Sequence, residues 1–125
     1  MARLEHLNVT VRDPDAFAAT LCRLFGWRVR WAGAALGDGR SVHVGDDDAY
    51  VALYRPAGQV TDPATTYGTH GAMNHIGVVV DDLDDTAARV STAGFVPRDH
   101  ASYAPGRRFY FDGPEGVEIE VVSYA

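Results

Sequence analysis

The sequence contains a single cysteine and no long apolar run. Cys22 alone cannot form an intrachain disulfide, and it cannot supply a cluster of thiolate metal ligands. No segment approaches the roughly 20 apolar residues that a membrane-spanning helix needs. The first residues also lack the basic and apolar blocks of a signal peptide. We therefore expect a cytoplasmic protein that does not span or bind a membrane.

Basic residues are also scarce, with 11 Lys and Arg against 17 Asp and Glu. The net charge of -6 and the absence of a basic run argue against a nucleic-acid or anionic-membrane surface. Hydrophobic residues make up 46% and charged residues 22%, as in ordinary globular proteins, and 125 residues fit one compact domain, 1–125. The expected partner is a small molecule.

The chain is expected to open with a strand at residues 4–12, where apolar and polar side chains alternate and His6 begins the polar face. A helix should follow, with Asp13 as its N-cap, a proline at its first position and Gly26 at its end. Further strands, separated by turns rich in glycine and aspartate, are expected at 27–31, 40–44 and 50–54. The first module, residues 1–56, is therefore predicted to be βαβββ.

Residues 57–73 are rich in Pro, Gly and Thr and are predicted to form a linker. After this linker the opening pattern returns, because the segment from His6 aligns without gaps on the segment from His75, with identity at half of the positions. Such a match is an internal repeat. After a second helix, strands are expected at 95–97, 107–111 and 117–122. The second module, residues 74–125, is thus predicted to be βαβββ as well.

The final hairpin carries a carboxylate on a strand that is otherwise largely apolar. An aromatic strand ends in a Pro/Gly turn at 112–116, and a second strand follows. Because strand side chains alternate, Ile119 faces one way, whereas Glu118 and Glu120 face the other. Glu120 is therefore expected to point away from the apolar layer. A simple solvated strand face is the alternative reading.

These features make the chain resemble the vicinal oxygen chelate superfamily: paired βαβββ modules, a histidine opening each module, and Gly-x-x-x-Glu in the last strand. The superfamily includes glyoxalases, extradiol ring-cleaving dioxygenases, fosfomycin-modifying enzymes and bleomycin-binding resistance proteins. The resemblance implies an α+β fold in which two curved mixed sheets form a cup around a divalent metal. It assigns metal ligation to His6, His75 and Glu120.

The superfamily has a fourth ligand position, the counterpart of Glu120 in the first module. Alignment of residues 117–122 with 49–54 places Ala52 there, and a shift of two residues would place Tyr54. Glyoxalase-like sites commonly use four protein ligands. Two histidines and one carboxylate, in contrast, are the ligand set of non-haem Fe(II) oxygenases. The sequence favours the three-ligand set.

A second resemblance is to the signature of the extradiol dioxygenases, carried by His100, Phe109, Tyr110, Pro114, Gly116 and Glu120. It implies that Tyr110 hydrogen-bonds a substrate oxygen and that His100 acts as acid and base. The gap after His100 is slightly long, and Gly113 stands where Asp, Glu, Asn, Thr or Ala is usual. The alternatives are a core or interface aromatic for Tyr110 and a loop histidine for His100.

The resemblance therefore implies an Fe(II) dioxygenase that acts on a vicinal diol or hydroxyketone of an aromatic or polyketide-like molecule, with dioxygen as its second substrate. One alternative is a glyoxalase-type lyase, isomerase or transferase that uses Zn, Ni or Mn. Another is a small-molecule-binding resistance protein. We also expect a homodimer, because small proteins of this kind cover their strand edges by self-association. The sequence leaves open whether His6 meets His75 of its own chain or of the partner.

Overall fold

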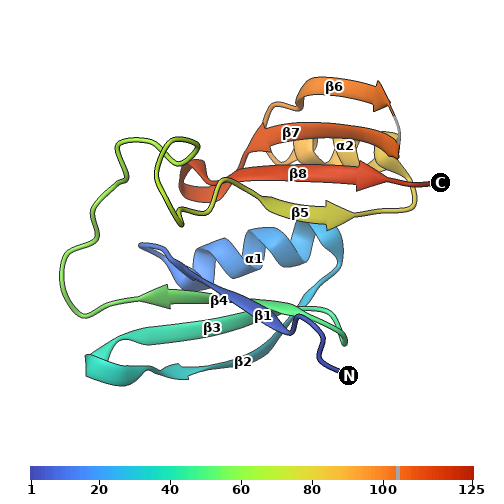
Figure 1. The fold of residues 1–125 in the computed structure, drawn as a ribbon. Coiled ribbons are helices and arrows are strands. Elements are labelled where there is room, and N and C mark those ends of the chain that lie inside the picture. Colours follow the sequence, from blue (N-terminus) through green and yellow to red (C-terminus); the bar gives the residue numbers. More distant parts are fainter. Residues whose placement is uncertain (104) are drawn as a thin grey trace. The chain divides into compact units, whose positions relative to one another are not determined.

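A computed structural model describes residues 1–103 and 105–125, and it divides into two compact units, Met1–Asp62 and Pro63–Ala125. The first unit contains β1 (His6–Thr10), α1 (Pro14–Phe25), β2 (Arg28–Ala34), a 3-10 turn (Leu36–Asp38), β3 (Arg40–Gly45) and β4 (Tyr50–Arg55). The second contains β5 (Ile76–Val79), α2 (Leu83–Thr92), β6 (Arg98–Tyr103), β7 (Gly106–Asp112), a 3-10 turn (Pro114–Gly116) and β8 (Glu118–Ser123) (Figure 1).

Each unit is built on a four-stranded mixed sheet. The strand orders are β1-β4-β3-β2 and β5-β8-β7-β6, and in both sheets the first strand pairs parallel to the last while the other pairs are antiparallel. One face of each sheet is apolar and packs on a helix, α1 on β3 and β4, and α2 on β8. The buried core residues include Phe17, Leu21, Leu24, Val44 and Leu53 in the first unit, and Val90, Phe109, Phe111, Ile119 and Val121 in the second. The predicted α+β class with two βαβββ modules is confirmed.

The helix boundaries follow local sequence signals in both units. Asp13 caps α1 by accepting a hydrogen bond from the backbone N–H of Ala16 at 3.0 Å, and Asp82 caps α2 in the same way through Asp85 at 2.9 Å. Gly26 ends α1 in the left-handed conformation, with φ of 69°. In the described part of the chain, neither helix is long and apolar enough to span a membrane.

The strand expected at 95–97 is wrong, because β6 begins only at Arg98. Pro97 has no N–H to give to a sheet, and the N–H of Phe95 donates instead to the carbonyl of Val90 at 3.1 Å, closing the end of α2. The Phe95 ring packs against Phe111, with 5.7 Å between ring centroids. Phe95 therefore belongs to the core beneath the sheet, and the strand starts after the proline.

Candidate functional site

Several ionisable side chains of the second unit lie together on the polar face of its sheet. On β8, Ile119 and Val121 are buried toward the helix, so the alternating residues Glu118 and Glu120 lie on the opposite face. Tyr110 on β7 is the register partner of Glu120. Strand alternation therefore places these residues on the expected face.

Glu120 is held at one of its oxygens and faces a histidine with the other. Its Oε1 accepts hydrogen bonds from the Tyr110 hydroxyl at 2.8 Å and from Arg108 Nη1 at 3.1 Å. Its Oε2 lies 3.4 Å from Nε2 of His75. The side chain of Glu120 is only 14% exposed, so its charge is balanced mainly by protein groups. The structure thus brings Tyr110, Glu120 and His75 together.

His75 is oriented through its other ring nitrogen. Nδ1 lies 3.1 Å from the Tyr67 hydroxyl and 3.3 Å from Oε1 of Glu118, and Tyr67 donates a short hydrogen bond to that same oxygen. A carboxylate and a phenol on this side favour the tautomer that carries its proton on Nδ1. Nε2 is then the nitrogen that faces Glu120.

Glu118 is kept ionised by its neighbours. Burial raises the pKa of this carboxyl, but hydrogen bonds from Arg98, at 2.7 Å, and from Tyr67 outweigh burial and hold the pKa below its usual value. Tyr110 shifts in the opposite direction, because its hydrogen bond to Glu120 and its burial raise its pKa to about 12. Tyr110 is therefore a protonated donor at neutral pH and does not act as a base.

The first unit orients His6 by the same means. Nδ1 of His6 lies 2.7 Å from Oε1 of Glu5, and the Tyr50 hydroxyl donates to that oxygen at 3.4 Å. The imidazole stacks on Tyr50 at 4.9 Å between ring centroids, and His43 stacks on Tyr50 at 4.5 Å. Burial, followed by the charges of His6 and Arg30, lowers the pKa of His43. His43 is therefore a packed, neutral member of a ring stack.

The sheet register settles which residue of the first module corresponds to Glu120. Glu120 pairs with Gly77, two residues after His75, and Ala52 pairs with Asn8, two residues after His6. Ala52 is therefore the counterpart, and Tyr54 is not. Ala52 shares its face with Asn8 and His43 and carries no group that binds a metal.

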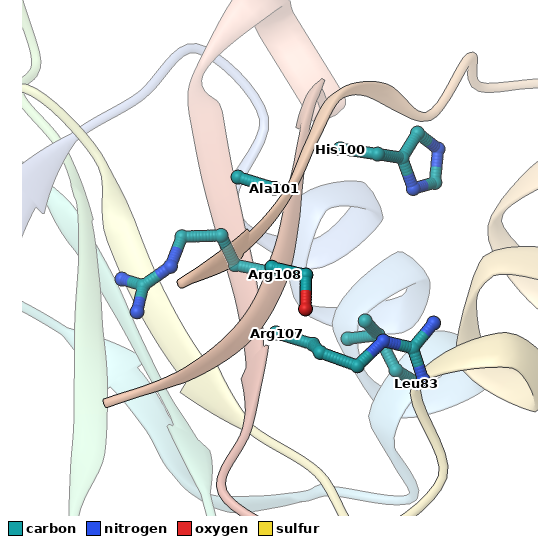
Figure 2. A pocket seen from close by; sticks show the side chains of 6 residues that line it. Leu83, His100, Ala101, Arg107 and Arg108 are labelled. Atoms are coloured by element: carbon teal, nitrogen blue, oxygen red, sulfur yellow. The ribbon is translucent and has the colours of Figure 1, made fainter. Parts of the chain in front are cut away.

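His100 lies on the opposite face of the second sheet from Glu120, so the structure does not bring it together with Tyr110, and its role as acid and base stays a prediction. Its ring packs on Phe109 at 5.5 Å, and it lines a cavity of about 160 Å³ together with Leu83 and Arg107. Figure 2 shows the side chain of Arg108 pointing away from His100. The cause is local: the register of β6 slips between Arg98 and Ala101, with Asp99 at a positive φ of 54°.

The donor atoms of the second unit suit a divalent metal. An imidazole Nε2 and a carboxylate Oε2 at 3.4 Å are close enough to bind one ion, and both are common ligands of such ions. No group of three or more His, Cys, Asp or Glu side chains is arranged to hold a metal among residues 1–103 and 105–125. His75 and Glu120 therefore form a two-donor pair in the second unit, and His6 belongs to the first unit.

Four polar residues that contact the predicted site residues were not themselves predicted from the sequence: Glu118, Arg108, Glu5 and Tyr67. Glu118 and Arg108 could have been found by strand alternation, since each lies two residues before a predicted site residue and shares its face. Glu5 is the residue directly before His6. Tyr67 lies within the predicted linker, where no sequence pattern points to a contact with His75.

Comparison with known proteins gives one family. The model of the Glyoxalase/Bleomycin resistance protein/Dioxygenase superfamily matches residues 3–121. No curated protein matches the sequence at a significant level.

Solved structures with the same fold include a glyoxylase/bleomycin resistance protein/dioxygenase domain from Frankia sp. EAN1pec, with 19% identity, 98% of each chain covered and a TM-score of 0.82. TnmS3, an antibiotic binding protein from Streptomyces sp. CB03234, shares 17% identity over 100% of this chain and 98% of its own, with a TM-score of 0.73. A third structure is a variant of the fosfomycin resistance protein FosX from Listeria monocytogenes, complexed with Mn(II) and 1S,2S-dihydroxypropylphosphonic acid. It shares 16% identity over 98% of this chain and 92% of its own, with a TM-score of 0.73. At these identities the likeness establishes the fold.

Proposed function

Because the chain belongs to the glyoxalase/bleomycin resistance protein/dioxygenase superfamily, we propose that it is a metal-dependent enzyme, and more specifically an Fe(II) dioxygenase. Its substrate would be a vicinal diol or hydroxyketone of an aromatic or polyketide-like small molecule, used together with dioxygen. His6, His75 and Glu120 would hold the metal. Both enzymes and binding proteins occur in the superfamily, so the proposal rests on the site.

The proposal rests on one observation: the rings of His6 and His75 have similar hydrogen-bonding neighbours. In each unit a glutamate oxygen lies beside Nδ1 of the ring, Glu5 for His6 and Glu118 for His75, and a tyrosine hydroxyl donates to that same oxygen, Tyr50 in the first unit and Tyr67 in the second. Metal-binding histidines characteristically use Nδ1 in this way, which fixes the tautomer and leaves Nε2 for the metal. In the second unit that Nε2 already faces the carboxylate of Glu120.

Each neighbouring side chain then has a definable task. Bound Fe(II) would acidify the diol and offer a position for dioxygen. The hydroxyl of Tyr110 holds Oε1 of Glu120, and its oxygen can accept a hydrogen bond from a substrate hydroxyl. Alanine at position 52 leaves three protein ligands, which is the set of the oxygenases. His100 has no role in this scheme because of the face on which it lies.

Metal content tests the ligand assignment. Protein purified without oxygen and supplied with Fe(II) should hold about one iron per chain, and His75→Ala and Glu120→Ala should each abolish retention. His100→Ala is the matched control, because it removes an imidazole from the other face of the same sheet and should retain iron. If His75→Ala binds iron as well as the parent does, the assignment is wrong.

Oxygen consumption tests the reaction class. With iron bound, a panel of catechol-type diols should include one that is lost in step with dioxygen. Conversion of a substrate without oxygen uptake, in protein loaded with Zn, Ni or Mn, would instead indicate a glyoxalase-type lyase, isomerase or transferase.

One contact favours a second candidate, a metal-free small-molecule-binding protein. Arg108 and Glu120 form an ion pair in which the side chains are only 12% and 14% exposed. This pair already balances the carboxylate charge without a metal. A parent protein that retains no divalent ion at all would support this candidate over the enzyme.

The proposal includes a homodimer. β1 and β2 are the edges of one sheet, and β5 and β6 are the edges of the other. Edge strands of this kind are commonly covered by association. Sedimentation at micromolar concentration should give the mass of two chains, and the mass of one chain would count against the dimer.

A further inference from the structure

Arg108 has hydrogen-bond donors that no residue in the described part of the chain accepts. Nη1 donates to Glu120, and the centre of the guanidinium lies 4.7 Å from the centroid of the Tyr103 ring. The remaining donors, Nε and Nη2, are shielded from solvent and find no partner among the residues that the structure describes. Buried guanidinium donors without an acceptor are costly, so this pair of atoms requires an explanation.

The geometry of the guanidinium indicates which kind of acceptor would satisfy Nε and Nη2. The N–H groups of Nε and Nη2 lie on the same edge of the planar group and point in parallel, which matches the two oxygens of a carboxylate or a phosphoryl group. Tyr103 covers one face of the plane, and Glu120 takes a different edge. The free edge is therefore a two-pronged donor to an oxyanion.

Three other carboxylates of this unit already pair with a different arginine, Arg98. Arg98 binds Glu118 at 2.7 Å and Asp112 at 2.8 Å, and it also binds Asp99 at 2.6 Å. The acceptor for the free edge of Arg108 is therefore expected to come from a bound molecule.

We propose that Arg108 binds an oxyanion group of the substrate, a carboxylate, phosphate or phosphonate, beside Glu120. The inference rests on the proposed function, because the shared contact with Glu120 places that group next to the metal-binding pair. The substrate is then an acidic small molecule that carries an oxyanion in addition to its vicinal oxygens. Arg108 is a specificity-determining residue that recognises this group.

The test uses metal-free, full-length protein labelled with nitrogen-15, treated with a chelating resin, and three separate probes: inorganic phosphate, methylphosphonate and acetate. At least one probe should shift, in a saturable manner, the Nε–H resonance of Arg108 in the parent and the backbone amide resonances of the neighbouring residues, which also report binding in the variants. Arg108→Met should weaken that binding by about tenfold or more, and Arg108→Lys should weaken it too, because lysine keeps the charge but loses the paired donors.

Arg107→Met is the matched control, since Arg107 is the adjacent arginine on the other face of the sheet and pairs with Asp84. It should bind the probe as the parent does. An unmoved Arg108 resonance with all three probes would overturn the inference in the parent protein itself. So would binding that Arg107→Met removes and Arg108→Met leaves intact. The titration is done without metal, so a failure to bind any probe would not change the result of the iron-retention assay. A failure to retain iron would likewise not change the result of the titration.

Discussion

In the first module His6 is oriented by Glu5, a side chain that is 63% exposed, whereas in the second module His75 is oriented by Glu118, which is 18% exposed and fixed by Arg98. The two histidines therefore receive the same kind of support, but at different degrees of burial. Two residues further along the paired strands, the modules diverge: the second carries Glu120 and the first carries Ala52.

This difference separates what the repeat preserves from what it varies. Both modules keep the strand order, the capping aspartate of the helix and the histidine before or at the first strand. Only the second module pairs a carboxylate with its histidine at the position of Glu120. The duplicated fold supplies two equivalent frameworks, and the proposed chemistry depends on their asymmetry.

The largest expected effect on iron retention comes from replacing Glu120, the residue that makes the two modules unequal. Glu120→Gln keeps the side-chain size and an oxygen that can accept from Tyr110, but it removes the anionic ligand. Iron retention should fall by more than about 100-fold, since even residues that only support a ligand cost 10- to 100-fold. Equilibrium dialysis measures this, with Asp84→Asn as a control for loss of one negative charge. Unchanged retention would remove Glu120 from the site.

A second variant makes the modules more alike. Ala52→Glu places a carboxylate at the counterpart of Glu120, on the face shared with Asn8 and His43. Metal retention should tighten by roughly tenfold, or 1.4 kcal/mol, while oxygen uptake should fall because a position needed by substrate or dioxygen is taken.

Ala52→Gln is the control for the added bulk, and circular dichroism establishes that each variant is folded, since position 52 is only 3% exposed. A folded Ala52→Glu protein with unchanged metal affinity and activity would show that Ala52 is not the vacant ligand position. The dioxygenase proposal would then lose its main support.

A third comparison distinguishes the two supporting carboxylates by the difference between their effects on metal binding. Glu118→Gln should weaken metal binding by about 10- to 100-fold, because it removes the charge that favours the Nδ1–H form of His75. Glu5→Gln should weaken binding less, because solvent screens an exposed pair. Calorimetric titration with Mn(II) compares the two variants directly. Equal losses would mean that burial does not set the strength of this support.

The smallest effect is on stability at acid pH. Burial raises the pKa of Glu118, but hydrogen bonds from Arg98 and Tyr67 outweigh it, so the pKa is lowered in the folded protein. The ionised carboxylate therefore stabilises the fold at pH values above its ordinary pKa of 4.5. That stabilisation is lost as the pH falls below this value through the folded pKa. Urea unfolding at a series of pH values should show a shallower acid decline for Glu118→Gln than for the parent. A parallel decline would contradict the shift.

The sequence predicted most of the fold because its signals are local. Asp13 and Gly26 mark the ends of α1, and strand alternation assigns Glu120 and Tyr110 to the polar face. The gap-free repeat from His6 to His75 predicted the second module before any contact was known. These features depend on spacing along the chain, which a single sequence displays directly.

The missed features depend on irregular backbone or on distant contacts. A bulge near Asp99 turns His100 to the opposite face, and alternation from a regular strand cannot anticipate this. Tyr67 reaches Glu118 and His75 from a segment with no periodic pattern. The paired donors of Arg108 become visible only when the hydrogen bonds of the whole face are known.

The most direct test of the account is nitrogen-15 NMR of the histidine rings before and after addition of Zn(II), a redox-silent ion. In metal-free protein, His6 and His75 should carry their proton on Nδ1. On addition of Zn(II), the Nε2 signals of these two residues should shift, while those of His43, His70 and His100 should not. A proton on Nε2 of His75, or shifts confined to the other three histidines, would contradict the proposed metal-binding role of both modules.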